Sequence, residues 1–265
     1  MAGLAKTKNF MLSSATIMIG PMADLHKLNP EEHSIGLVKN FQMTADPTFV
    51  ELTQGVMNTV VMSVKNGEGL KASMEVYEYT LRNLAYAAGL DASGTGYDPI
   101  DTIWVTASDI ATANTVTVTT DLSLLLATGD YVFLQNGLDD KVHIAKVATA
   151  AFETDTTTVT FAAGYETQVD GLFPAGSRLG KVKKIPLGDV TNQPELGVKV
   201  VGILPKNNAP FTILIPRAKI TKGMGVAFQT DNFGNLPFEI SPYAGVPEDP
   251  FYAEYGSAVA VLFPR

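Results

Sequence analysis

Cysteine is absent from the 265 residues of this chain, and histidine and tryptophan are scarce. Without thiols the chain can form neither disulfides nor thiolate sites, which suits a protein made in a reducing compartment. The three histidines, His26, His33 and His143, lie far apart, and no HExxH pattern or recognisable triad context accompanies them. The sequence therefore contains none of the usual motifs of a hydrolase or of a zinc site. We expect no catalytic residue, no metal site and no cofactor, and hence no enzyme.

The chain has no excess of positive charge and no long hydrophobic run. The chain has 19 lysines and arginines against 27 acidic residues, which gives a net charge of −8. Tight binding of nucleic acid usually needs a basic patch, and no strong one is present. No segment approaches the ~20 consecutive apolar residues that a membrane-spanning helix requires. We expect neither tight binding of nucleic acid nor insertion of the chain into a membrane.

What the chain does contain is typical of a β-rich protein. Hydrophobic residues make up 46% of the sequence, which is enough for one large or two small cores. The 15 prolines and 23 glycines lie mostly between short apolar runs, as in folds with many turns. The sequence therefore predicts a mainly β fold.

The stretch from Ser34 to Leu90 has the clearest pattern. Strands are expected at Leu37–Thr44 and Phe49–Val64, and the second has an apolar face that should pack in a core. Residues 66–69, with the sequence Asn-Gly-Glu-Gly, predict a turn, and Lys71–Tyr79 predicts a third strand. The apolar face of the second strand comprises Val50, Leu52, Val56, Val60, Met62 and Val64.

A short helix is expected directly after the third strand. Thr80 can cap its N-terminus, and Gly89 can end it. Leu81, Leu84 and Ala85 then fall on one face, because side chains three and four residues apart are neighbours on a helix. We expect one short α-helix in the fold.

Between Ile100 and Gly188 the sequence changes to short β-type runs separated by turn signals such as Asn136-Gly137. Runs this short suggest a small barrel or sandwich of its own, with Trp104 in the core. The runs are Thr102–Val105, Asn114–Thr120, Asp130–Gln135, Val142–Thr149, Thr156–Phe161 and Lys181–Ile185. The sequence thus predicts a domain of residues 99–188 inserted into a domain formed by residues 1–98 and 189–265.

Longer strand patterns resume after the insert. Pro216 lies inside one of them, which fits an edge or a bulge and not a central strand. The predicted strands are Gly197–Leu204, Phe211–Lys219, Gly223–Gln229 paired with Leu236–Ile240, and a final Ser257–Phe263.

Four segments resemble bacteriophage tail tube proteins, a family of major tail proteins: Glu51–Gly55, Glu75–Tyr86, Ile215–Ile220 and Leu236–Ile240. The resemblance covers both ends of the chain but not the middle, and its motifs are less specific than a catalytic motif. It implies a tail-tube-like β-sandwich with one short α-helix, which carries the inserted small β-barrel or sandwich domain. It also implies a structural virion protein that polymerises as stacked hexameric rings into the tail tube, a conduit for DNA ejection into the host.

The resemblance further implies partners and a location. The chain would associate with its own copies, with a tape measure protein, a tail terminator and baseplate or tip proteins, and in a contractile tail with a sheath protein. Viral DNA would pass without specific binding, and an acidic conduit suits this because like charges repel the phosphates. Assembly in the host cytoplasm would place the protein in the virion tail. Residues 1–14 and Met22–His33 are the candidates for contacts between rings.

In such a ring, the strands Leu37–Thr44 and Phe49–Val64 are the candidates for a continuous barrel around the channel. Their polar faces would line it, because hydroxyls and amides hydrate well and Glu51 repels phosphate. The predicted lumen-lining residues are Asn40, Gln42, Thr44, Glu51, Thr53, Thr59 and Ser63.

Three alternatives remain open from the sequence. A tube protein of a contractile injection or secretion system would share the fold without passing DNA. An enzyme would need a catalytic constellation, and a membrane β-barrel would need an export signal and strands of ~10 residues with aromatic girdles. Gene neighbours that encode a tape measure or a terminator would favour the phage tube.

Overall fold

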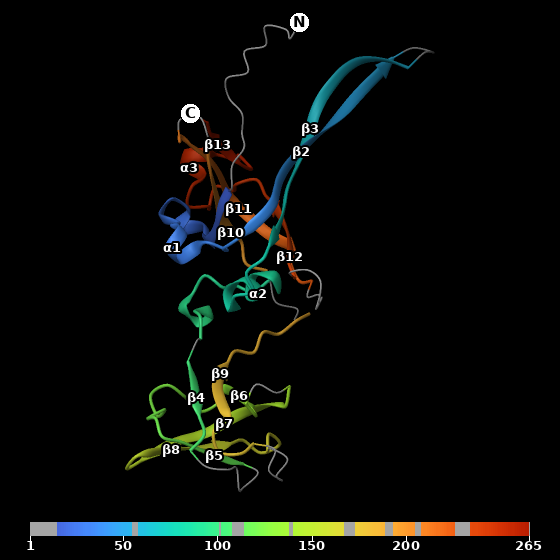
Figure 1. Cartoon of the computed structure of the whole chain (residues 1–265). Coiled ribbons are helices and arrows are strands. Elements are labelled where there is room, and N and C mark those ends of the chain that lie inside the picture. Colours follow the sequence, from blue (N-terminus) through green and yellow to red (C-terminus); the bar gives the residue numbers. More distant parts are fainter. Residues whose placement is uncertain are drawn as a thin grey trace, which may run out of the picture. The chain divides into compact units, whose positions relative to one another are not determined.

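The structure is a computed structural model that describes residues 15–54, 58–100, 102–107, 114–137, 140–166, 173–188, 193–204, 208–225 and 234–264. Strands make up 51% and helices 11%, which confirms the predicted mainly β class. The chain divides into two compact units (Figure 1), Met1–Asp98 with Pro186–Arg265, and Pro99–Ile185. The sequence placed these boundaries after residues 98 and 188.

Among the described residues, seven strands form the antiparallel sheet of the first unit, in the order β1-β10-β11-β12-β3-β2 with β13 paired to β11. Strand β12 shows how this sheet acquires a core face. Leu236, Phe238 and Ile240 are buried and alternate with the less buried Pro237 and Glu239, as the period of two requires. The strands are β1 (Ala15–Pro21), β2 (Val38–Gln54), β3 (Thr59–Val76), β10 (Leu196–Ile203), β11 (Pro210–Lys222), β12 (Leu236–Pro242) and β13 (Val261–Phe263).

Pro216 lies at a bulge in β11, one of the two positions that its sequence context predicted. The register shifts between Leu196 and Val198, whose partners are Ala218 and Ile215. Proline has no N–H to donate, so a bulge accepts it without the loss of a ladder hydrogen bond. The strand itself is central, because β10 flanks it on one side and β12 and β13 on the other.

The predicted helix is present as α2 (Leu81–Ala87). The Thr80 Oγ1 accepts a hydrogen bond from the Asn83 N–H at 3.1 Å and caps the helix, and Gly89 follows with a φ of 78°. The expectation of a single helix is wrong, because the described residues contain further short helices, two of them in the segment Met22–His33. These are η1 (Met22–Lys27), α1 (Pro30–His33), η2 (Thr95–Tyr97) and α3 (Tyr252–Tyr255).

The second unit is a small barrel. Its described strands pair in the order β4-β9-β6-β7-β8-β5. A bridge between Thr106 and Val118, with a 2.8 Å hydrogen bond from the Ala107 N–H to the Thr117 carbonyl, joins the two ends and closes the sheet. The interior is a core that includes Trp104, Leu134, Val159 and Leu179. The strands are β4 (Ile103–Val105), β5 (Thr115–Val118), β6 (Tyr131–Gln135), β7 (Val142–Glu153), β8 (Thr156–Phe161) and β9 (Arg178–Val182).

Strands β2 and β3 form one long two-stranded ribbon, which differs from the predicted arrangement. Strand β2 continues through the break expected after Thr44, and the turn predicted at residues 66–69 is wrong because these residues lie inside β3. A register shift between Thr48 and Phe49 makes Asn66 the extra residue of a β-bulge. A bulge accommodates an Asn-Gly sequence within a strand, and this explains why a turn signal did not produce a turn.

The apolar face expected to pack in a core is exposed. Leu52 and Met62 are 62% and 59% exposed, and Val50, Val60 and Val64 are about equally accessible. Val56 lies outside the described residues. Figure 1 shows the reason, because the outer part of the ribbon extends beyond the other strands of its sheet and no other described element covers it.

Two other expectations concern segments that the structure describes only in part. Strand β12 pairs with β11 and β3, and residues 223–225 of the strand predicted to pair with it lie in no strand. Residues 226–229 of that predicted strand, and residues 1–14 at the N-terminus, lie outside the described part of the chain.

Candidate functional site: an exposed ribbon and an apolar cavity

The register of β2 and β3 defines two faces of the ribbon, because directly opposite residues in an antiparallel pair share a face. Glu51 pairs with Ser63 and Leu52 pairs with Met62, so we call the two faces the Glu51 face and the Leu52 face. The Glu51 face includes Met43 with Ala72, Ala45 with Leu70, Phe49 with Lys65, Glu51 with Ser63 and Thr53 with Val60. The Leu52 face includes Gln42 with Ser73, Thr44 with Lys71, Thr48 with Gly67, Val50 with Val64, Leu52 with Met62 and Gln54 with Thr59.

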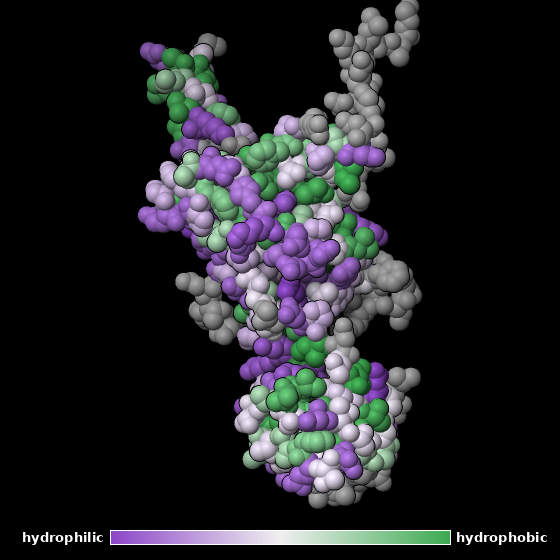
Figure 2. Space-filling view, turned by 90° about the vertical axis from the view of Figure 1, so that its left-hand side faces the viewer, coloured by the Kyte–Doolittle hydropathy of each residue, from purple (hydrophilic) through white to green (hydrophobic). Residues whose placement is uncertain are grey.

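Both faces change polarity along the ribbon. The Leu52 face is polar at the base and becomes apolar from Val50 outward, until Gln54 and Thr59 close it. The Glu51 face is apolar at the base and carries polar groups such as Glu51 and Ser63 further out. Figure 2 shows hydrophobic and hydrophilic patches side by side on the projecting ribbon. The outer half of the Leu52 face is therefore an apolar patch with a polar border at each end.

The seven predicted lumen-lining residues all lie on this ribbon and are exposed, but they do not share a face. Glu51, Thr53 and Ser63 lie on the Glu51 face. Asn40 occupies a bulge near the base, where its φ is 54°. The remaining three, which lie on the Leu52 face, are Gln42, Thr44 and Thr59.

Two features of β2 and β3 explain why the predicted lumen-lining residues lie on different faces. Strand β2 is continuous, so residues 42 and 44 have the opposite parity from Glu51 and Thr53 and point to the other face. In β3 a register shift makes Val61 an extra residue, and this turns Thr59 away from the face of Ser63. Neither feature is visible when the two strands are analysed separately.

Polar groups hold the bulge at the base of the ribbon. The Tyr77 hydroxyl donates to Glu75 Oε2 at 2.9 Å, and the Lys39 ammonium lies 4.6 Å from the centre of the Tyr77 ring. The hydrogen bonds from Tyr77 and from the Asn40 side chain lower the pKa of Glu75. A charged carboxylate on β3 therefore ties the bulged part of β2 to its neighbour.

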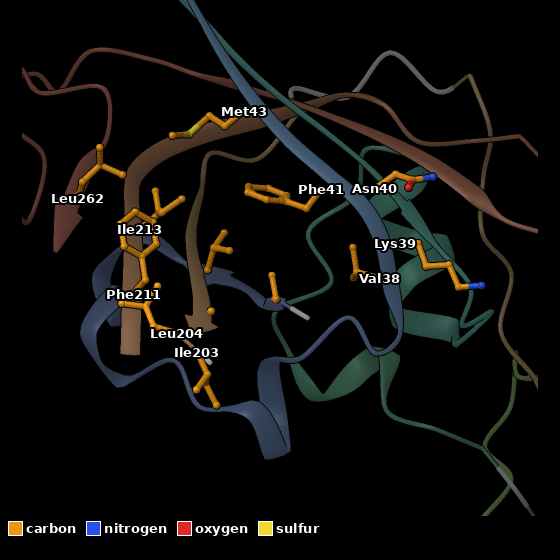
Figure 3. A pocket seen from close by; sticks show the side chains of 13 residues that line it. Val38, Lys39, Asn40, Phe41, Met43, Ile203, Leu204, Phe211, Ile213 and Leu262 are labelled. Atoms are coloured by element: carbon orange, nitrogen blue, oxygen red, sulfur yellow. The ribbon is translucent and has the colours of Figure 1, made fainter. Parts of the chain in front are cut away.

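An apolar cavity of about 680 Å³ lies beside the ribbon base. Its walls include Phe41 and Met43 from β2, Ile203 from β10, Phe211 and Ile213 from β11, and Leu262 from β13. Figure 3 shows Phe41 and Met43 directed toward the side chains of β11 and β13, whereas Lys39 and Asn40 point the other way. The cavity is therefore lined mainly by apolar side chains, and the side chains of Lys39 and Asn40 point away from the apolar wall of β11 and β13.

The floor of the cavity explains why the described residues leave it unfilled. Ala15 of β1 and Gly202 of β10 are register partners and both line the cavity. Ala15 contributes only a methyl group and Gly202 has no side chain, so the larger side chains of β2 and β11 face one another across a gap. Pockets of this size, about 300–1,000 Å³ and mostly apolar, are typical of binding sites.

The histidines do not converge on a chemical site. His26 Nε2 lies 3.1 Å from the Tyr255 hydroxyl, His33 lies in α1, and His143 Nε2 lies 3.0 Å from the Tyr165 carbonyl oxygen. Within the ranges that the structure describes, no three or more His, Cys, Asp or Glu side chains form a group that could hold a metal ion. The described helices include none that is long and apolar enough to cross a membrane.

Sequence reasoning predicted strands over most of the ribbon residues but not the pairing that forms the ribbon, and it missed the cavity. The cavity walls come from parts of β1, β2, β10, β11 and β13, which are joined only by the order of strands in the sheet. Exposed apolar residues at strand ends, such as Ile203 and Leu262, gave no local signal that they border a common space.

Comparison with known proteins gives no family for this chain, so a function must be inferred from its sequence and structure. The chain matches no protein-family model, and it matches no curated protein.

Proposed function

We propose that the chain is the structural subunit of a phage tail tube, which polymerises as stacked hexameric rings around a channel for viral DNA. The observation that carries the proposal is the exposed ribbon, whose outer half presents Val50, Leu52, Met62 and Val64 to solvent. Exposed apolar patches of this kind on a folded protein mark interaction surfaces. The tail-tube-like segments of the sequence indicate that the partner is another copy of the chain.

The edges of the first sheet support association between copies. Among the described strands, β1 and β2 each have a single neighbour at the two ends of the sheet order, and β13 pairs with β11 alone. Strand edges tend to pair with other chains, and a ring uses this tendency by placing each edge against the next subunit. A subunit with two such edges suits a closed ring.

The channel-lining set that we propose is Glu51, Thr53 and Ser63, because these residues share the Glu51 face. Short hydroxyls stay hydrated, and a carboxylate repels the DNA phosphates. The chain as a whole has a net charge of −8, which favours passage of DNA without adhesion. The further partners in this proposal are a tape measure protein, a tail terminator, and baseplate or tip proteins.

Negative-stain electron microscopy and light scattering of the purified chain test the proposal. Rings or tubes with a central hole are expected as the protein concentration rises. A chain that stays monomeric at every concentration and also fails to enter tails in infected cells would overturn it. Neighbouring genes for a tape measure and a terminator would separate a phage tube from a secretion tube.

A further inference from the structure

We propose that residues 10–12, with the sequence Phe-Met-Leu, dock in the apolar cavity at the ribbon base of their own chain and close it. The inference goes beyond the proposed function and does not depend on it, because it concerns a contact within one subunit. It gives the cavity one occupant, the segment that precedes β1.

The cavity lies where the described part of the chain begins. Ala15 is the first described residue and the first residue of β1, and it lines the cavity. Its register partner is Gly202, and the two residues after that partner, Ile203 and Leu204, line the cavity as well. In an antiparallel pair one strand begins where the other ends, so β1 begins at a wall of the cavity.

Chain length limits how far residues 10–12 can lie from this wall. Leu12 precedes Ala15 by three residues and Phe10 precedes it by five. A chain spans at most about 3.6 Å per residue, which gives about 11 Å for Leu12 and about 18 Å for Phe10. The three side chains are therefore tethered close to the cavity of the same chain.

The segment and the cavity match in chemistry. Residues 10–12 are three consecutive large apolar residues, between a lysine and an asparagine on one side and two serines on the other. Figure 3 shows Phe41 and Met43 directed across the cavity toward Phe211, Ile213 and Leu262. The volume of about 680 Å³ lies in the range that holds a drug-sized ligand, which is comparable to three large side chains. Docking removes both apolar surfaces from water, and this drives the contact.

The short tether favours the chain's own segment over other occupants. A short linker that spans two sites gives an effective concentration in the millimolar range. At micromolar protein, the segment of the same chain is therefore favoured about a thousandfold over the segment of a second copy. A small apolar molecule must likewise displace the segment before it enters.

Docking makes residues 10–12 an intramolecular plug. A ligand or partner that needs the cavity binds only to the fraction of subunits in which the segment is out, so its apparent affinity falls by that fraction. The first strand of the sheet and the edge of β2 are then linked through the segment, in addition to the strand order of the sheet.

The test uses the absence of cysteine from the chain. The full-chain variants Phe10→Cys, Met11→Cys and Leu12→Cys each place one thiol in the segment, and Ala5→Cys is the matched control. The rate of modification by a maleimide is measured for each folded variant at micromolar concentration. It is divided by the rate for the same variant unfolded in urea, because this removes differences in intrinsic thiol reactivity.

At least one thiol among residues 10–12 should react about tenfold more slowly than the Ala5→Cys thiol, because a docked thiol reacts only when the segment leaves the cavity. All three positions are needed, since side chains of an extended segment alternate in direction and not every one enters the cavity.

A change in the cavity wall should remove this protection. The wall variant is Ile203→Asp with Leu262→Asp, and these side chains are 52% and 51% exposed, so it should fold like the unmodified chain. Added to the slowest cysteine variant, it should restore the fast rate. The matched control, Thr53→Asp with Ser63→Asp, adds the same charge on the Glu51 face and should leave the protection unchanged.

Three outcomes overturn the inference. The first is equal normalised rates for the four thiols. The second is protection that persists in the wall variant, which would place the segment elsewhere. The third is protection that weakens when the protein is diluted about a hundredfold, which would make a second copy the source of the occupant. Protection that withstands dilution and is lost in the wall variant supports the inference even if the unmodified chain forms no rings or tubes, a result that rejects only the tail tube.

Discussion

Single buried polar residues join segments that are distant in the sequence. The Asn83 side-chain amide, in α2, donates hydrogen bonds of 2.9 Å to the carbonyls of Ile35 and Glu78. In the barrel, the Thr157 hydroxyl donates to the Thr120 carbonyl at 2.6 Å and accepts from a backbone N–H. Both side chains are almost fully buried. Buried polar groups are tolerated only when they are paired, so each one specifies which backbone segments must meet.

Removal of the Asn83 amide should destabilise the first unit. Asn83→Ala leaves two carbonyls without their donor, and we expect the free energy of unfolding to fall by about 2 kcal/mol. Urea denaturation measures the change. Gln42→Ala, which removes an exposed amide on the ribbon, is the control and should change the stability by less than about 0.5 kcal/mol. Equal stabilities for the two variants would contradict the role given to Asn83.

At the scale of elements, β11 is held to the segment before β10 by an ion-pair fork. Arg217 Nε lies 2.8 Å from Glu195 Oε2 and its second terminal nitrogen lies 2.9 Å from Oε1, while the Lys219 ammonium lies 3.3 Å from the same carboxylate. The hydrogen bonds from Arg217, followed by that from Lys219, lower the pKa of Glu195. Arg217 directly follows Pro216 in the bulge. Its ion pair with Glu195 therefore links the two segments where the backbone pairing of β10 and β11 is irregular.

This fork makes a pH-dependent contribution to stability. The folded pKa of Glu195 lies below the ordinary value of about 4.3, so the contribution is complete above that pH and is lost as the pH falls through the lowered pKa. Glu195→Gln should lower the free energy of unfolding by about 1 kcal/mol near pH 7, since the pair is partly solvent-screened. The difference between the two proteins should shrink as the pH falls from neutral to well below the ordinary pKa of a glutamate. A difference that stays constant over this range would show that the carboxylate charge is not involved.

At the scale of the molecule, the two units have separate cores. The cluster that contains Trp104, Leu134 and Leu179 consists entirely of residues of the barrel. Met18, Leu25, Leu28 and Leu214 form a cluster within the first unit alone. A domain with its own core is expected to fold by itself.

Residues 99–185 expressed alone should therefore unfold cooperatively in urea, with an m-value of about 1–2 kcal/mol/M for a chain of this size. The matched chain, in which a short Gly/Ser linker replaces these residues, should stay soluble and retain β-rich circular dichroism. A disordered isolated barrel would contradict the division into independent cores. Rings from the shortened chain would additionally place the barrel outside the assembly contacts.

The sequence by itself determined the features that depend on near neighbours in the chain. The α2 cap is an interaction between Thr80 and Asn83, three residues apart, so a local pattern contains all of its parts. The short strands of the barrel were found for a similar reason, because alternating residues and intervening turns are local. The boundaries were less accurate: the run predicted at Lys181–Ile185 is β9, Arg178–Val182, and the run predicted at Val142–Thr149 extends to Glu153 as β7. Gly180 weakens the strand pattern there. Glycine is needed at this position because a Cβ on it would overlap the ring of Phe133, a residue far away in the sequence.

Only the tertiary structure decided what covers each face and which strands meet. Alternation shows that Val50, Leu52, Met62 and Val64 share a face, but burial depends on a second layer that no local pattern encodes. The Asn66-Gly67 sequence fits a turn or a bulge equally well, and pairing with β2 selects the bulge. The cavity joins parts of β2, β10, β11 and β13 because the sheet order brings them together. Local sequence specifies conformation and period, whereas partners and cavities arise from contacts between residues far apart in the chain.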